Sequence, residues 1–125
     1  MTLDEIKKEI IKADKIVILS HESPDGDAVA SSLSVKHAVA KLGKEADVII
    51  PEFPKDFEFL PKADEIRVES DVENYDLAIA VDCADLKRLV GAKRYFETAK
   101  KTIEIDHHSV NSMFADLNYV DPVAP

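Results

Sequence analysis

The strongest constraint on the fold of this 125-residue chain is a set of short, β-rich apolar runs separated by longer segments. The runs cover residues 15–20, 46–50, 77–81 and 102–105. Nearly continuous apolar strands are typical of a parallel sheet that is covered on both faces. Intervening segments of helix length favour the same architecture, because parallel strands need long crossover connections. We therefore predict an α/β fold, with a parallel β-sheet and helices on both faces.

Helical patterns occupy much of the sequence between these runs. Residues 3–13 carry apolar side chains at helical intervals and are predicted to form an amphipathic helix. A second helix is predicted over residues 27–42, and Gly43 suits the position just past its end. A third is predicted over residues 86–101, although Gly91 weakens its middle. Further short strands are predicted over residues 66–68 and 118–121, with a loop or short helix over residues 51–65.

The composition excludes several classes of protein. A formal net charge of −9 argues against broad, non-specific binding to nucleic acid. No apolar stretch approaches the roughly 20 residues that span a bilayer, and the N-terminus lacks the apolar region of a signal peptide. The single cysteine, Cys83, excludes an internal disulfide framework and favours a reducing cytoplasm. The absence of a P-loop, a dinucleotide fingerprint and a G-x-S-x-G elbow excludes the commonest nucleotide triphosphatases, dehydrogenases and serine hydrolases.

Side chains that can bind metal ions directly follow three of the predicted strands. His21 follows the first strand, within a turn that also carries Asp25 and Asp27. Asp82 follows the third strand. The fourth strand is followed by Asp106, His107 and His108. Ligands of open α/β sheets bind outside the carboxyl ends of the strands, so we expect these clusters to converge at one edge of the sheet.

The convergence of these side chains favours a site for divalent cations. Several carboxylates placed close together repel one another, and a divalent cation relieves that repulsion. Mixed carboxylate and imidazole ligands suit manganese, iron, cobalt or zinc better than magnesium or calcium. The number of ligands exceeds what one ion needs and suits two ions about 3.5–4 Å apart, which clamp a phosphoryl group and generate a hydroxide nucleophile. Each cluster alone also fits ordinary turn or capping chemistry, but their coincidence at strand ends favours the metal site.

The three clusters resemble the motifs of the DHH family of phosphoesterases. HESPDGDAVASSL resembles the first motif, VDCADLKRL the second and IDHHSVNSMFADLNYVDPVA the third. The PDGD form and the N-x-x-F-x-D-x-N-x-V-D continuation are similar to the bacterial oligoribonuclease and phosphoadenosine-phosphate phosphatase subfamily. The resemblance runs from about Lys15 to the C-terminus. It implies a cytoplasmic phosphoric ester hydrolase that acts on short oligonucleotides, nucleoside 3′,5′-bisphosphates or cyclic dinucleotides.

The resemblance also implies a site with two manganese ions, for which magnesium, cobalt or zinc are alternatives. His21 and Asp25 would hold one ion. Asp27 and His107 would hold the other, and Asp82 would bridge the two.

The remaining motif residues are implied to act on the substrate or to support the metal ligands. His108 would face the substrate phosphate, and Asp106 would orient the histidines. Arg88 and Asn111 match positions that are expected to contact the substrate. The catalytic set that the resemblance implies is therefore Asp82, Asp106, His107 and His108.

Members of the family also carry a fourth motif, with a further metal-binding aspartate, and a separate C-terminal substrate-binding domain. Neither is present in residues 1–125, which we therefore expect to be a partial catalytic domain with weak or absent turnover. Two other functions stay open, a non-catalytic metal- or nucleotide-binding module and a pyrophosphatase or exopolyphosphatase that uses the same site. No protein partner or membrane association is indicated, and a homodimer is left open.

Overall fold

The computed structural model of the chain describes residues 3–20, 26–51, 63–72, 74–83, 89, 91–106 and 115–120. These residues form a six-stranded sheet in the order β3-β2-β1-β4-β5-β6, and all neighbouring strands are parallel. The α/β class that the apolar runs predict is confirmed. In chain order the elements are α1 (Leu3–Lys12), β1 (Ile16–Leu19), α2 (Gly26–Lys41), β2 (Ala46–Ile49), the 3-10 helix η2 (Ala63–Glu65), β3 (Ile66–Arg67), β4 (Leu77–Val81), α3 (Lys93–Glu97), β5 (Lys101–Asp106) and β6 (Leu117–Val120).

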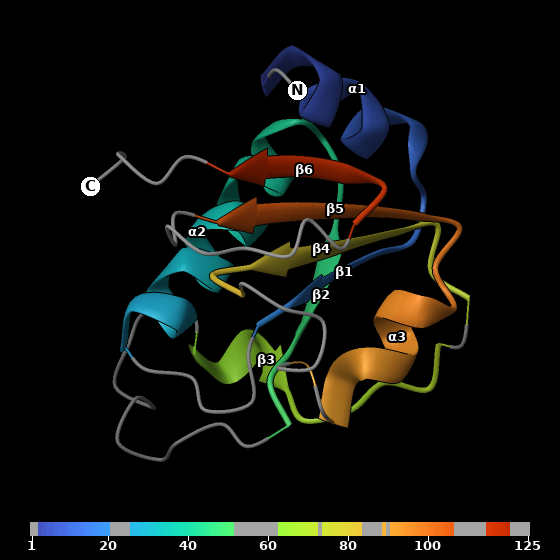
Figure 1. The fold of residues 1–125 in the computed structure, drawn as a ribbon. Helices are drawn as coiled ribbons and strands as arrows, with labels where there is room; N and C mark the ends of the chain where they lie inside the picture. Colours follow the sequence, from blue (N-terminus) through green and yellow to red (C-terminus); the bar gives the residue numbers. More distant parts are fainter. Residues whose placement is uncertain are drawn as a thin grey trace.

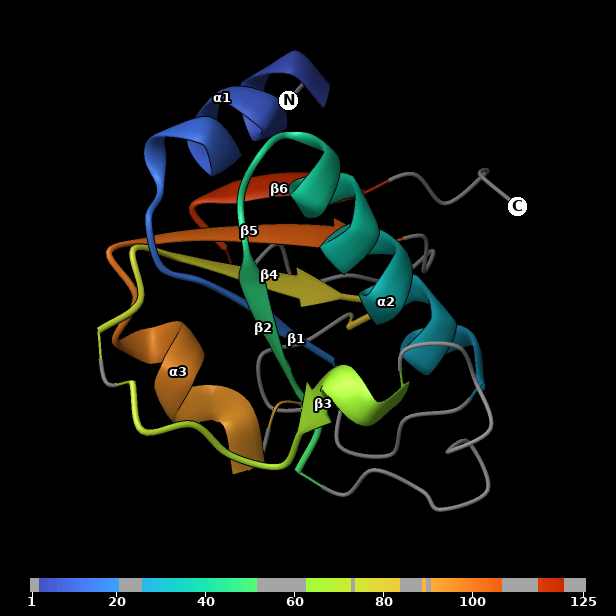
Figure 2. The same ribbon diagram turned by 180° about the vertical axis from the view of Figure 1, so that it is seen from behind.

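Helices cover both faces of the sheet (Figure 1). On one face, Ile6 of α1 and Val29 of α2 pack in a cluster with alternate strand residues such as Ile18 and Ile79. On the other face, Phe96 of α3 packs with the intervening strand residues. Figure 2 shows α2 crossing the sheet with its first turns at the arrowhead end of β4 and β5. No helix in the described part of the chain has the length and apolarity that a bilayer crossing requires.

The predicted third helix differs most from the structure. The prediction extends from residue 86 to 101, whereas α3 covers Lys93–Glu97 and residues 84–88 lie outside the described ranges. After α3, the hydroxyl of Thr98 donates a hydrogen bond to the carbonyl of Arg94 at 2.8 Å. Lys101 then pairs with Leu77 as the first residue of β5. Pairing in the sheet therefore overrides the helical tendency of the last predicted residues.

The order of the strands creates a switch point between β1 and β4. From β1 the chain moves outward through β2 to β3, whereas β4, β5 and β6 extend the sheet in the opposite direction. In open α/β sheets, ligands bind in the crevice outside the carboxyl ends of the strands at such a point. The fold thus places the residues that follow β1 and β4 where a ligand is expected to bind.

The opposite, amino end of the sheet is held by Asp76, which immediately precedes β4. Its Oδ2 atom accepts hydrogen bonds from the backbone N–H groups of Asp14 at 3.1 Å and Lys15 at 2.9 Å. Its other oxygen lies 3.2 Å from the ammonium group of Lys100. These contacts, the backbone bond from Lys15 most of all, hold the pKa of Asp76 below its usual range. One carboxylate therefore ties the entries to β1, β4 and β5 together.

We expect Asp76→Ala to lower the free energy of unfolding by about 1–2 kcal/mol, because two backbone N–H groups lose a charged acceptor. Urea unfolding of both proteins measures the difference. The lowered pKa implies that the wild-type advantage is complete above the ordinary aspartate pKa of about 4 and is lost as the pH falls through the lowered value. Asp64→Ala, at an exposed aspartate, serves as the control. An advantage that did not change in acid would contradict this role for the carboxylate.

Candidate functional site

Three adjacent strands bring the predicted site segments to one edge of the sheet. Leu19 at the end of β1 is in register with Ala80 of β4, and Val81 is in register with Ile105 of β5. The residues that come next in the sequence therefore leave the sheet side by side. The three strands that precede the clusters therefore end at a common edge, and the convergence of the cluster side chains stays a prediction.

Asp82, the first residue after β4, has an unusual backbone. Its φ angle is +54°, the left-handed region that residues other than glycine seldom occupy, although aspartate and asparagine tolerate it better than most. Its N–H donates a hydrogen bond to the carbonyl of Ile105 at 3.0 Å, so the chain remains attached to β5 at this point. The residue is only 7% exposed. Strained backbone of this kind is commonly stored at functional sites.

Asp106 ends β5 directly beside this turn. It is 5% exposed and pairs in register with Val120 of β6. Because adjacent strands lie about 4.8 Å apart, the backbones of Asp82 and Asp106 are close neighbours. The structure thus brings together two of the predicted site residues, both of them buried carboxylates.

The structure describes little of the other predicted residues. Asp27 is the second residue of α2, and only its backbone position is described. Within the described ranges, no group of three or more histidine, cysteine, aspartate or glutamate residues is placed to hold a metal ion. The metal and substrate roles of all the predicted site residues stay predictions. Six of these residues lie outside the described ranges, namely His21, Asp25, Arg88, His107, His108 and Asn111.

Two buried polar residues near the same edge are absent from the sequence-based prediction. Glu104 is wholly buried in β5, in register with Ala80 on one side and Asn118 on the other. Ser20 is 3% exposed, and its hydroxyl has no hydrogen-bond partner among the residues that the structure describes. Burial of an unsatisfied hydroxyl costs about 1–3 kcal/mol. Both residues could have been noticed in the sequence, because each is polar and lies in an apolar run. Glu104 lies between two isoleucines, and Ser20 follows the run IVIL.

The described residues fit a divalent cation in their chemistry. Asp82 and Asp106 present acidic side chains on adjacent strands with little access to water. The carboxylate oxygens are ligands that manganese and magnesium accept.

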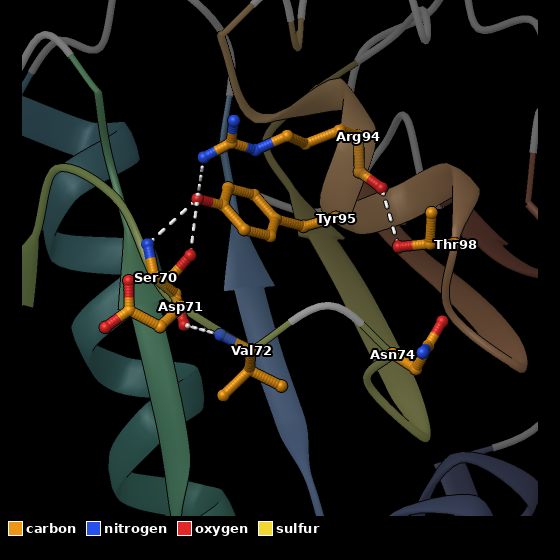
Figure 3. A pocket seen from close by; sticks show the side chains of 7 residues that line it. All are labelled: Ser70, Asp71, Val72, Asn74, Arg94, Tyr95 and Thr98. Carbon is orange, nitrogen blue, oxygen red and sulfur yellow. Dashed lines mark hydrogen bonds between the residues drawn. The ribbon is translucent and has the colours of Figure 1, made fainter.

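A pocket of about 420 Å³ lies near α3 and the segment that precedes β4, away from the carboxyl ends of the strands. Figure 3 shows its lining, in which the polar groups bond to one another. The hydroxyl of Tyr95 receives hydrogen bonds from the backbone N–H of Ser70 at 2.8 Å and from the guanidinium of Arg94 at 2.6 Å. This guanidinium also lies 4.7 Å from the centre of the Tyr95 ring. The pocket contains none of the predicted site residues, and we assign no part of the site to it.

Two curated relatives match most of this chain. The bifunctional oligoribonuclease and PAP phosphatase NrnA of Thermus thermophilus is 39% identical over 118 residues, which cover 91% of this chain and 35% of the relative. The probable enzyme of the same name in Streptococcus mutans is 32% identical and covers 91% of this chain and 36% of the relative. The chain thus spans about a third of the length of these relatives.

A solved structure has the same fold. An exopolyphosphatase-related protein from Bacteroides fragilis superimposes with a TM-score of 0.81 at 31% sequence identity. The match covers 95% of this chain and 38% of that protein. The model of the DHH family N-terminal domain matches residues 15–125, which include all three strand-end clusters. The chain therefore belongs to the DHH family.

Proposed function

We propose that this chain forms part of the catalytic domain of a metal-dependent phosphoesterase, which hydrolyses short oligonucleotides or nucleoside 3′,5′-bisphosphates. The observation that carries the proposal is the pair of buried carboxylates, Asp82 and Asp106, on adjacent strands beside the switch point. Membership of the DHH family and the names of the NrnA relatives support the class of reaction. A cytoplasmic location is part of the same proposal.

The proposed centre takes two divalent cations, with manganese as the first choice. His21 and Asp25 would hold one ion, Asp27 and His107 would hold the other, and both ions would share Asp82. When bound, the cations would supply Lewis-acid polarisation of the phosphoryl group and a more acidic water molecule.

The residues of the chain would position the substrate. His108 would face the phosphate and donate a hydrogen bond to it, and Arg88 and Asn111 would contribute further donors. Asp106 would orient the neighbouring histidines, which fixes the ring nitrogen that each presents to the centre. In the reaction, the oxygen of a water molecule bonds to phosphorus and the water loses a proton, the ester P–O bond breaks, and the leaving oxygen takes up that proton.

A second function has support from one comparison. The solved relative in Bacteroides fragilis is described as exopolyphosphatase-related, and a phosphoanhydride would use the same chemistry at the metal centre. A non-catalytic metal- or nucleotide-binding module is the remaining alternative. These functions differ in which phosphorus bond, if any, is cleaved.

Asp82→Asn tests the bridging role with little disturbance of the backbone. Asparagine also tolerates the left-handed region, so the φ of +54° can persist while the charge is lost. We expect both manganese sites to weaken together, and any hydrolysis that the wild-type chain shows to fall by about 100-fold or more. Calorimetric titration with Mn²⁺ and a phosphate-release assay measure these effects.

Two further variants control this experiment. Asp82→Gly removes the carboxylate and relieves the backbone strain, so it should reproduce the loss of metal if the carboxylate is the cause. Asp71→Asn changes an exposed aspartate at the amino end of the sheet and should leave metal binding unchanged. Loss of one manganese site with retention of the other would contradict a bridging Asp82.

Substrate preference separates the three functions. With Mn²⁺ present, we expect a dinucleotide and a nucleoside 3′,5′-bisphosphate to be hydrolysed about tenfold faster than pyrophosphate, because contacts to a nucleoside add transition-state binding that pyrophosphate lacks. Chromatography of the products measures each rate. Faster cleavage of pyrophosphate would favour the exopolyphosphatase function. Binding of two Mn²⁺ ions with no cleavage of any of the three would favour the binding module.

A further inference from the structure

Ser20 occupies a position where a hydroxyl group has no structural purpose that the described residues reveal. In the two flanking strands, Ile50 and Val81 stand one residue beyond the partners of Leu19. Both belong to the apolar cluster on the face that α1 and α2 cover, whereas Leu19 belongs to the cluster on the other face. Alternation along the strand therefore directs the Ser20 side chain toward α2.

The first turn of α2 packs on the same face of the sheet. Val29, which is fully buried, belongs to the same cluster as Ile50 and Val81, so the amino end of α2 lies on the face toward which Ser20 points. Figure 2 places that end of α2 beyond the arrowheads of the central strands. The first four N–H groups of a helix have no partner within it and, with the helix dipole, favour negative charge nearby. Asp27, a proposed metal ligand, lies in this same turn.

The hydroxyl of Ser20 is buried and has no hydrogen-bond partner among the described residues. At position 20, beside Ile50 and Val81, an apolar residue would avoid the free-energy cost of burying an unsatisfied polar group. A serine in such a place is explained if its hydrogen bond forms only when another group arrives. Three groups of the proposed centre follow Ser20 within seven residues, namely His21, Asp25 and Asp27.

We infer that Ser20 is a positioning residue of the proposed metal centre, whose hydroxyl donates a hydrogen bond to a carboxylate ligand when a divalent cation is bound. This inference rests on the proposed function, because it requires that a cation bind at the carboxyl ends of β1 and β4. The bond orients the ligand and satisfies the buried hydroxyl at the same time. Ser20 itself does not touch the cation or the substrate.

Calorimetric titration of the chain with Mn²⁺, after removal of metal with a chelator, tests this role. We expect Ser20→Ala to weaken Mn²⁺ binding by about 10- to 150-fold, which is the loss of one hydrogen bond to a charged acceptor. Thermal unfolding in the presence of the chelator should show the variant to be as stable as the wild type or more stable, because the unsatisfied hydroxyl is gone. A residue with a merely structural role would show the reverse, a loss of stability without metal.

Two variants make the comparison specific. Ser20→Thr keeps the hydroxyl and should bind Mn²⁺ within about threefold of the wild type, as a conservative substitution that retains the donor. Ser34→Ala removes an exposed hydroxyl from α2 and should leave the affinity unchanged. Equal Mn²⁺ affinity of wild type and Ser20→Ala would overturn the inference and leave the proposed function standing. A wild-type chain that takes up no Mn²⁺ would overturn both, and the wild-type titration alone reveals that outcome.

Discussion

The parallel pairing of β1 with β4 is the constraint on which the rest of this structure depends. Both strands bury side chains on both faces, so neither can move without exposing apolar surface to water. The strand order reverses at this pair, and the chain leaves β1 toward one half of the sheet while β4 begins the other. The carboxyl ends of the two strands therefore lie side by side, and the residues that follow them, including Ser20 and Asp82, leave the sheet at the same edge. The pairing thus fixes both the fold and the place where chemistry can occur.

Much of this arrangement is predictable from the sequence, because burial on both faces leaves a continuous apolar signal. The runs that contain Ile16–Leu19 and Leu77–Val81 predict β1 and β4 to within a residue or two. The neighbours of each strand are not predictable in this way, since nothing in an apolar run says which other run it pairs with. Asp82 can be predicted as a candidate site residue from its place directly after a strand. Its left-handed backbone cannot be predicted, because aspartate is also common in ordinary turns.

The two ends of the sheet use polar groups in different ways. At the amino end, Asp76 accepts two backbone hydrogen bonds, and the hydroxyl of Tyr75 donates to the carboxylate of Asp47 at 2.7 Å. Desolvation by burial raises the pKa of Tyr75, which keeps it a donor. The carboxyl end instead holds a strained backbone at Asp82 and the buried hydroxyl of Ser20. Departures from local rules gather at functional sites, so this asymmetry itself favours the carboxyl end as the site.

Electrostatics sets a condition on the proposed function of so acidic a chain. The net charge of −9 opposes the approach of any phosphate to the molecule. The two divalent cations of the proposed centre would invert the local charge, while the rest of the surface would still repel anions within the roughly 8 Å that salt leaves unscreened. A long polyanion would then meet repulsion along its whole length, whereas a substrate of one or two phosphates would meet chiefly the cations. If the proposed centre forms, the charge of residues 1–125 would therefore favour short substrates and leave the binding of phosphate to the cations.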